Sequence, residues 1–136
     1  MHPIVEEHAR LAEILDRIQA LDAAPAATLP PARWHRLWQS ELAELSTLLQ
    51  QHFAREEEGG YMAEVVASRP SWSDRIARLG REHATLSSGL REIVHHLGPT
   101  HSPSGLREWS KAMRAHERAE SEILQSAWYT DRGAGD

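Results

Sequence analysis

Two short segments of the chain combine residue types that bind metals. His52 is followed four residues later by Glu56, and His116 is followed four residues later by Glu120. In a helix, residues four apart lie on the same face, so each pair would present an imidazole and a carboxylate side by side. Both pairs fall at positions where the surrounding pattern would place leucine. We therefore interpret them as polar residues on a buried face.

Two further histidines occupy comparable positions elsewhere. Glu7-His8-Ala9-Arg10-Leu11 in the first half is matched by Glu82-His83-Ala84-Thr85-Leu86 in the second. Each half of the chain therefore supplies a lone histidine and then a His-x-x-x-Glu pair, which gives the six polar residues a two-fold pattern.

Buried carboxylates need compensation. One unpaired buried carboxylate costs several kcal/mol, and two that face each other cost more, whereas a whole domain is stable by only about 5–15 kcal/mol. The two glutamates must therefore be exposed, paired or bound to cations. Four imidazoles and two carboxylates suit a pair of transition-metal ions.

We predict that two histidines bind each ion and that both carboxylates bridge the pair. His8 and His52 would bind one ion, and His83 and His116 would bind the other. The complete set of predicted metal ligands is His8, His52, Glu56, His83, His116 and Glu120.

The elements that must position these residues are helices. Apolar residues recur at intervals of three and four, and no segment alternates with a period of two. The pattern predicts helices over 3–22, 32–58, 72–97 and 104–130, with the second kinked at Gly59-Gly60 and resuming to about residue 68. Short connections between such helices indicate an all-α fold, an antiparallel up-down four-helix bundle with a kinked second helix.

Composition limits the class of protein. A length of 136 residues predicts a single domain over 1–136, with its core at about 4–130. The chain has no cysteine, which excludes disulfides and thiolate metal sites. The net charge is −5, and the basic residues are scattered, which argues against nucleic acid as a partner. No signal sequence or membrane span is visible, so we expect a cytoplasmic protein; the oligomeric state stays open.

The order lone His, His-x-x-x-Glu, lone His, His-x-x-x-Glu resembles the hemerythrin-like (HHE cation-binding) domain family. The resemblance covers residues from about 4 to 127. It implies a four-helix bundle with a non-heme di-iron centre, in which two carboxylates and an oxo or hydroxo ligand bridge the ions. It also implies that the protein binds or senses a small ligand such as O2, NO or peroxide, or decomposes peroxide or NO as an oxidoreductase.

The chain departs from the oxygen-carrying members of this family in two places. Those have a second histidine on the third helix where this chain has Ser87, and a bridging aspartate where it has Ser121. Glu120 takes over as the bridge, which gives a symmetric variant with four histidines and two glutamates. This favours redox or sensing roles over reversible oxygen carriage.

Several alternatives stay open. Manganese or zinc could replace iron, and the bundle could store iron or serve a structural role without metal.

Glu57, Glu58 and Glu117 follow the predicted ligands, and we interpret them as solvated or as supporting residues. A Glu-x-x-His segment, Glu92 to His95, resembles a ferritin-type ligand pair but occurs once and flanks the apolar face. The catalytic residues of an enzyme are unknown from the sequence, although the Tyr61 hydroxyl could approach the metals.

Overall fold

A computed structural model describes residues 3–24, 29–58, 61–98 and 102–134. Four long helices are α1 (Pro3–Ala23), α2 (Pro31–Glu58), α4 (Ser73–His95) and α5 (Leu106–Ala134). A short helix α3 (Tyr61–Ser68) and a 3₁₀ turn (Pro70–Trp72) connect α2 to α4. The described residues contain no β-strand.

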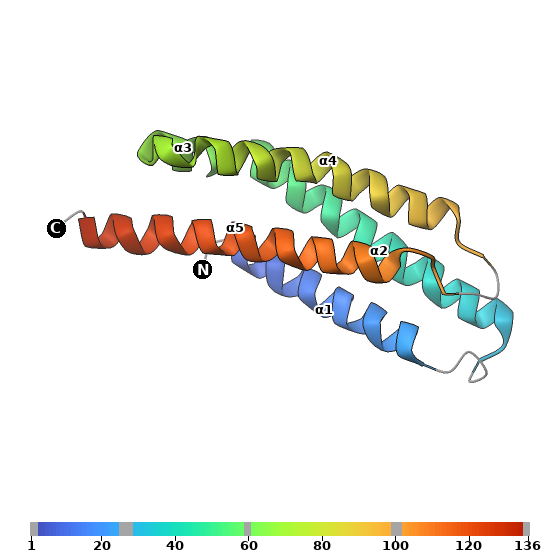
Figure 1. The fold of residues 1–136 in the computed structure, drawn as a ribbon. Helices are drawn as coiled ribbons and strands as arrows, with labels where there is room; N and C mark the ends of the chain where they lie inside the picture. The colour runs from blue at the N-terminus through green and yellow to red at the C-terminus, as the bar shows by residue number, and fades with distance from the viewer. Residues whose placement is uncertain (1–2, 25–28, 59–60, 99–101, 135–136) are drawn as a thin grey trace.

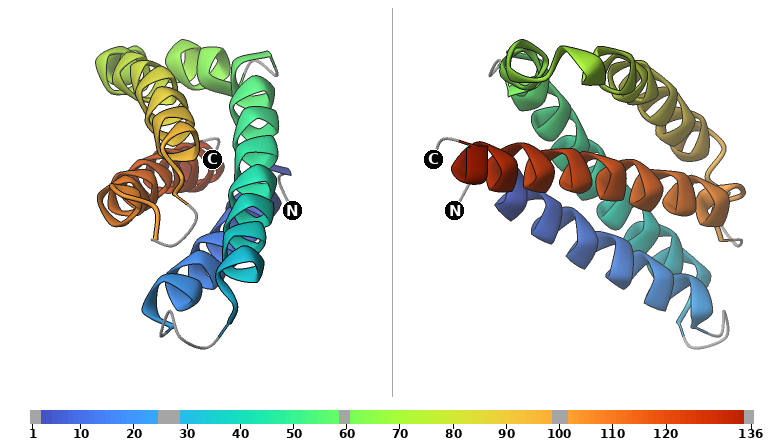
Figure 2. Two further views of the ribbon diagram at one scale, coloured as in Figure 1. Left: turned by 90° about the vertical axis from the view of Figure 1, so that its right-hand side faces the viewer. Right: turned by 60° about the vertical axis from the view of Figure 1, so that its left-hand side comes forward.

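The four long helices form an all-α four-helix bundle (Figure 1). In that view α1 and α4 run from left to right along the chain, whereas α2 and α5 run from right to left. α1 packs against α2 and α5, and α4 packs against the same two helices. Figure 2 shows the four helices around a common interior, with α3 at the end where α2 stops and α4 begins.

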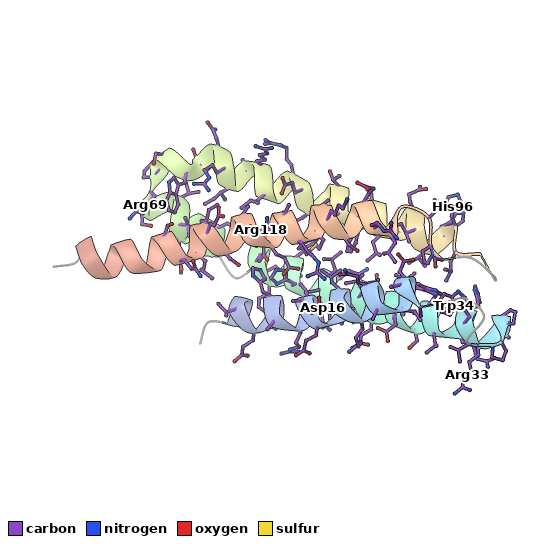
Figure 3. The ribbon with its side chains drawn as sticks, turned by 60° about the horizontal axis from the view of Figure 1, so that its bottom comes forward. Asp16, Arg33, Trp34, Arg69, His96 and Arg118 are labelled. Carbon is purple, nitrogen blue, oxygen red and sulfur yellow. The ribbon has the colours of Figure 1, made fainter. Side chains whose placement is uncertain are left out.

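The predicted apolar faces form the interior. A larger core cluster contains Leu11, Leu45 and Trp38 together with the apolar residues of α4 and α5 nearest the loop between them. A smaller cluster joins α3, the beginning of α4 and the later part of α5 through residues such as Val65 and Ile123. Along α4 and α5, the polar residues of the candidate site fall between these two clusters. In Figure 3, α4 can be followed between the labelled Arg69, which precedes the 3₁₀ turn, and His96, which follows the last residue of α4.

One hydrogen bond fixes α5 against α4. Trp109 Nε1 donates to the backbone carbonyl of Leu86 at 2.8 Å, inside the protein. Gly89 leaves room for this indole, because a Cβ at Gly89 would lie 3.0 Å from Trp109 Cδ1. Trp109 lies about two helical turns before His116, and Leu86 lies one turn after His83. The contact therefore helps to bring His83 level with His116.

Exposed ion pairs connect α1 to both of its neighbours. Arg17 Nη2 lies 2.7 Å from Glu44 Oε2 on α2, and Arg114 Nη2 of α5 lies 2.8 Å from Asp16 Oδ1. Such exposed pairs contribute little stability. They lie on the same helix as His8 and favour its alignment with α2 and α5.

Most helix bounds agree with the sequence-based ranges to within two residues, and the main differences lie around α3 and at the end of α5. α4 begins at Ser73, after a 3₁₀ turn that takes up residues 70–72. α5 continues to Ala134 instead of ending near 130, and no proline interrupts it. The helix expected to resume after the paired glycines is a separate element, α3, and the glycines themselves lie outside the described residues.

Candidate metal centre

All four long helices contribute side chains to one buried polar layer. α1 supplies His8 and α4 supplies His83, while α2 and α5 each supply a histidine and a glutamate four residues apart. The helical spacing places both members of each pair on the inward face. His8 is half-buried, and each of the other five side chains is 0–3 % exposed. All six residues predicted from the sequence therefore lie together inside the bundle.

Their donor atoms form two overlapping groups. His8 and His52 meet both glutamates in one group, and His83 and His116 meet the same glutamates in the other. Within each group, the ligand atoms lie within 4.8 Å of one another. Glu56 and Glu120 belong to both groups. This sharing is the arrangement that two bridging carboxylates would need.

Hydrogen bonds orient the rings of α2 and α5. His52 Nδ1 donates to Glu7 Oε2 at 2.6 Å, and His116 Nδ1 donates to Glu82 Oε1 at 2.7 Å. An ionised carboxylate can only accept, so these bonds place the ring proton on Nδ1 and leave the Nε2 lone pair free. A neutral imidazole in this tautomer is the form that binds a metal through Nε2.

The rings of α1 and α4 are oriented in the same way. His83 Nδ1 donates to Glu57 Oε1 at 3.1 Å, and His8 Nδ1 lies 3.1 Å from the hydroxyl oxygen of Ser121. Phe53 stacks on the His83 ring, with centroids 4.0 Å apart and planes 10° from parallel. Packing and hydrogen bonding together hold the four rings with Nε2 turned inward.

The inward atoms lack protein partners. Buried side-chain atoms without a hydrogen bond include the Nε2 atoms of all four histidines and both oxygens of both glutamates, namely those of His8, His52, His83, His116, Glu56 and Glu120. Several of these atoms approach one another, with His83 Nε2 3.0 Å from Glu56 Oε2 and His116 Nε2 2.5 Å from Glu120 Oε1, but not with hydrogen-bond geometry. Buried polar atoms normally have partners. Eight such atoms pointing at one volume fit a set of metal ligands.

The charges of the layer affect one another. Burial raises the pKa of Glu120, and the neighbouring Glu56 raises it further. Burial opposes ionisation of Glu56 as well, but contacts from His52, His83 and Glu120 outweigh it and lower the pKa of Glu56. Two buried carboxylates that lie next to each other share one proton in the absence of cations. Bound cations would take the place of that proton.

The pKa values of the histidines shift in different directions. Burial lowers the pKa of His8 to about 4, and the nearby His52 adds to the effect. Burial also lowers the pKa of His116 more than the hydrogen bond to Glu82 raises it. For His52, burial acts downward, but Glu56 and Glu7 together raise its pKa. Neutral imidazoles are the ligand form, so the lowered values of His8 and His116 favour metal binding near neutral pH.

The side chain of Glu117 is buried, so the solvated alternative for this residue is wrong. We expected a solvated or a supporting residue; the side chain is only 9 % exposed, and its buried Oε1 has no hydrogen-bond partner. Burial raises the pKa of Glu117 to about 7. Glu117 follows His116 at the border of the apolar face of α5 and lines a groove between α1 and α5.

The other candidates lie away from this layer or outside the described residues. Glu92 and His95 are exposed on α4 and belong to neither group of ligand atoms. Glu58 is exposed, and Glu57 supports His83 from the surface. The expectation for Tyr61 concerns its hydroxyl group, and the side chain of this residue lies outside what the structure describes. Within the described ranges, no helix has the length and apolar character needed to cross a membrane.

Comparison with protein families matches residues 1–128 to the hemerythrin HHE cation binding domain. The match covers α1, α2 and α4 completely, α5 up to residue 128, and every residue of the polar layer. No curated protein and no solved structure matches the chain.

Proposed function

The chain belongs to the hemerythrin HHE cation-binding domain family, and from this premise we propose that it holds two iron ions to bind or sense a small ligand. The ligand would be a molecule such as O2, NO or peroxide. Iron bound here supplies redox chemistry and open coordination positions. The His/Glu layer is able to hold a metal cation; the identity and number of the ions are our proposal.

The eight buried atoms without partners are the observation that carries this proposal. Four neutral imidazole nitrogens and four carboxylate oxygens suit iron, manganese or zinc and disfavour copper(I). With Glu56 and Glu120 shared, each ion would have two nitrogen ligands and oxygen ligands from the bridges. This leaves each ion short of six ligands, with room for one from outside.

The protein residues have three separate tasks in this proposal. Glu7, Glu57 and Glu82 fix the tautomer and orientation of three histidines through Nδ1. Glu56 and Glu120 supply negative charge to the ions. The surrounding apolar clusters exclude water from the layer.

Burial also restricts the size of the ligand. The predicted ligand side chains other than His8 are 0–3 % exposed, so the layer itself presents almost no surface to solvent. A molecule of two or three heavy atoms could enter between the helices, whereas a larger substrate would have to displace the core. This favours diatomic molecules and peroxide.

Elemental analysis of protein purified without added metal tests the proposal. We expect about two iron ions per chain and an absorption spectrum of a bridged ferric pair. His83→Ala should hold less metal than the unaltered chain, whereas His95→Ala, which changes an exposed histidine on the same helix, should hold the same amount. Less than about half an equivalent of any transition metal, even after reconstitution, would overturn the proposal.

Ligand chemistry separates the proposed role from its alternative. Stoichiometric binding of NO or O2 by the iron-loaded protein supports binding or sensing. Repeated turnover of peroxide or NO would show instead that the protein is an oxidoreductase. Uptake of many iron ions per chain would indicate storage.

A further inference from the structure

The hydrogen bonds behind the histidines repeat the two-fold pattern of the sequence. In each half, the glutamate just before the lone histidine accepts a hydrogen bond from the paired histidine of another helix. Glu7 accepts from His52 at 2.6 Å, and Glu82 accepts from His116 at 2.7 Å. These two bonds are equivalent in partner type, atom and length.

The pattern breaks at one position. The residue after each bridging glutamate contacts the lone histidine of another helix. After Glu56 this residue is Glu57, whose carboxylate lies 3.1 Å from His83 Nδ1. After Glu120 it is Ser121, whose hydroxyl lies 3.1 Å from His8 Nδ1. One half of the site therefore has two supporting carboxylates, and the other half has one.

A hydroxyl supports a metal-binding histidine less well than a carboxylate. The carboxylate attracts the Nδ1 proton, raises the basicity of Nε2 and fixes the tautomer. The Ser121 hydroxyl can donate or accept. When it donates to Nδ1, the ring proton of His8 lies on Nε2, and that tautomer cannot bind a metal through Nε2.

The same half is also more open to solvent. A groove of 360 Å³ between α1 and α5 is lined by His8, Ser121 and Glu117, among others. His8 is half-buried, unlike the other three histidines. A second groove, of 570 Å³ between α4 and α5, reaches His116, but that side chain is only 2 % exposed.

From these observations we infer that the two cation positions are unequal and that Ser121 makes them so. The inference rests on the proposed two-metal function. The position of His83 and His116 binds its cation more tightly. The position of His8 and His52 binds more weakly and exchanges its cation with the surroundings, through the groove between α1 and α5.

One feature reduces the difference and another increases it. The Glu57 side chain is 59 % exposed, so water weakens its effect on His83 and lowers the affinity of the tighter position. The carboxylate of Glu7 is shared between His52 and Arg55, which reduces its effect on that histidine and lowers the affinity of the weaker position as well. Loss of such a supporting group costs about 10- to 100-fold in metal affinity. We expect a difference at the lower end, about tenfold.

Variants that keep only one of the two cation positions test the difference in affinity, because a single bound ion meets no repulsion from a second one. His8→Ala leaves the position of His83 and His116, and His83→Ala leaves that of His8 and His52. Co²⁺ is the probe, its affinity is measured by competition with a chelator, and circular dichroism checks folding. We expect the His8→Ala protein to bind Co²⁺ about tenfold more tightly than the His83→Ala protein.

Exchanging the supporting residues assigns the cause. Ser121→Glu in the His83→Ala protein should tighten Co²⁺ binding about tenfold, and Glu57→Ser in the His8→Ala protein should weaken it about tenfold. Ser121→Ala is the matched control and should change the affinity less than about threefold. If Ser121→Glu fails to fold, the Glu57→Ser arm decides.

The outcomes separate this inference from the function on which it rests. Equal affinities of the two single-position variants, or no effect of Glu57→Ser, would overturn the inequality while leaving the two-metal site intact. If the unaltered chain binds no Co²⁺, the proposed function itself is wrong.

Discussion

Replacing Glu117 by glutamine should stabilise the metal-free protein, and the gain should grow with pH. Burial raises the pKa of Glu117 from 4.5 to about 7. The folded state therefore holds a proton between these values that the unfolded state has released. Stability is lost as pH rises through this window, because the unfolded state lowers its free energy by releasing the proton while the buried carboxyl group of the folded state keeps it.

The size of the effect follows from the shift. At about 1.4 kcal/mol per pKa unit, the shift of Glu117 corresponds to about 3 kcal/mol of stability lost above pH 7. Integrated over pH, the loss is about 1 kcal/mol at pH 5 and about 3 kcal/mol at pH 8. Glutamine has a similar shape and no charge, so Glu117→Gln should avoid this loss.

Guanidinium unfolding of chelator-treated protein at pH 5 and pH 8 measures the difference. The gain from Glu117→Gln should increase by about 2 kcal/mol between these pH values. Glu122→Gln, at an exposed position on the same helix, controls for the loss of one negative charge and should give no such increase. A gain that is the same at both pH values, or an equal increase in the control, would refute the reasoning.

Three further outcomes are expected. Glu56→Ala combined with Glu120→Ala should abolish metal binding while circular dichroism retains the helical signal, because the burial cost of both carboxylates disappears with them; unfolding of this variant would contradict the prediction. Free metal at 100 times its dissociation constant should raise the free energy of unfolding by about 2.7 kcal/mol, and a chelator should reverse this; equal melting curves with and without chelator would argue against a bound cation. Leu45→Ala, at a fully buried position of α2, should lower the free energy of unfolding by about 2–5 kcal/mol in denaturant titrations. Leu37 lies on the same helix and is 37 % exposed, so Leu37→Ala should lower the free energy of unfolding by less than about 1 kcal/mol. Similar losses in these two leucine variants would contradict the assigned core.

The helices could be predicted from the sequence because their apolar residues keep helical spacing throughout. The grouping of the six polar residues followed from the same pattern, since a histidine or glutamate at a leucine position must face the core. His83 illustrates this: it continues the spacing of the apolar residues of α4 and lies 3 % exposed in the interior. Their role as ligands remains a prediction.

Two of the supporting residues could not be predicted in this way. Glu7 and Glu82 lie off the apolar faces, and their contacts depend on how each helix is rotated against its neighbour. Burial of Glu117 depends likewise on the approach of α1 to α5. Spacing within one helix carries no information about such rotations, so these contacts required the structure.

The polar layer divides the interior into two apolar clusters that touch the site from opposite sides. Without cations, little apolar contact crosses this layer, and the smaller cluster of α3 and the adjoining ends of α4 and α5 could open as a separate cooperative unit. A cation pair bound by all four helices would join both units into one. Metal binding would then slow amide hydrogen exchange in α3, in the 3₁₀ turn and at the beginning of α4. The fold itself would not change.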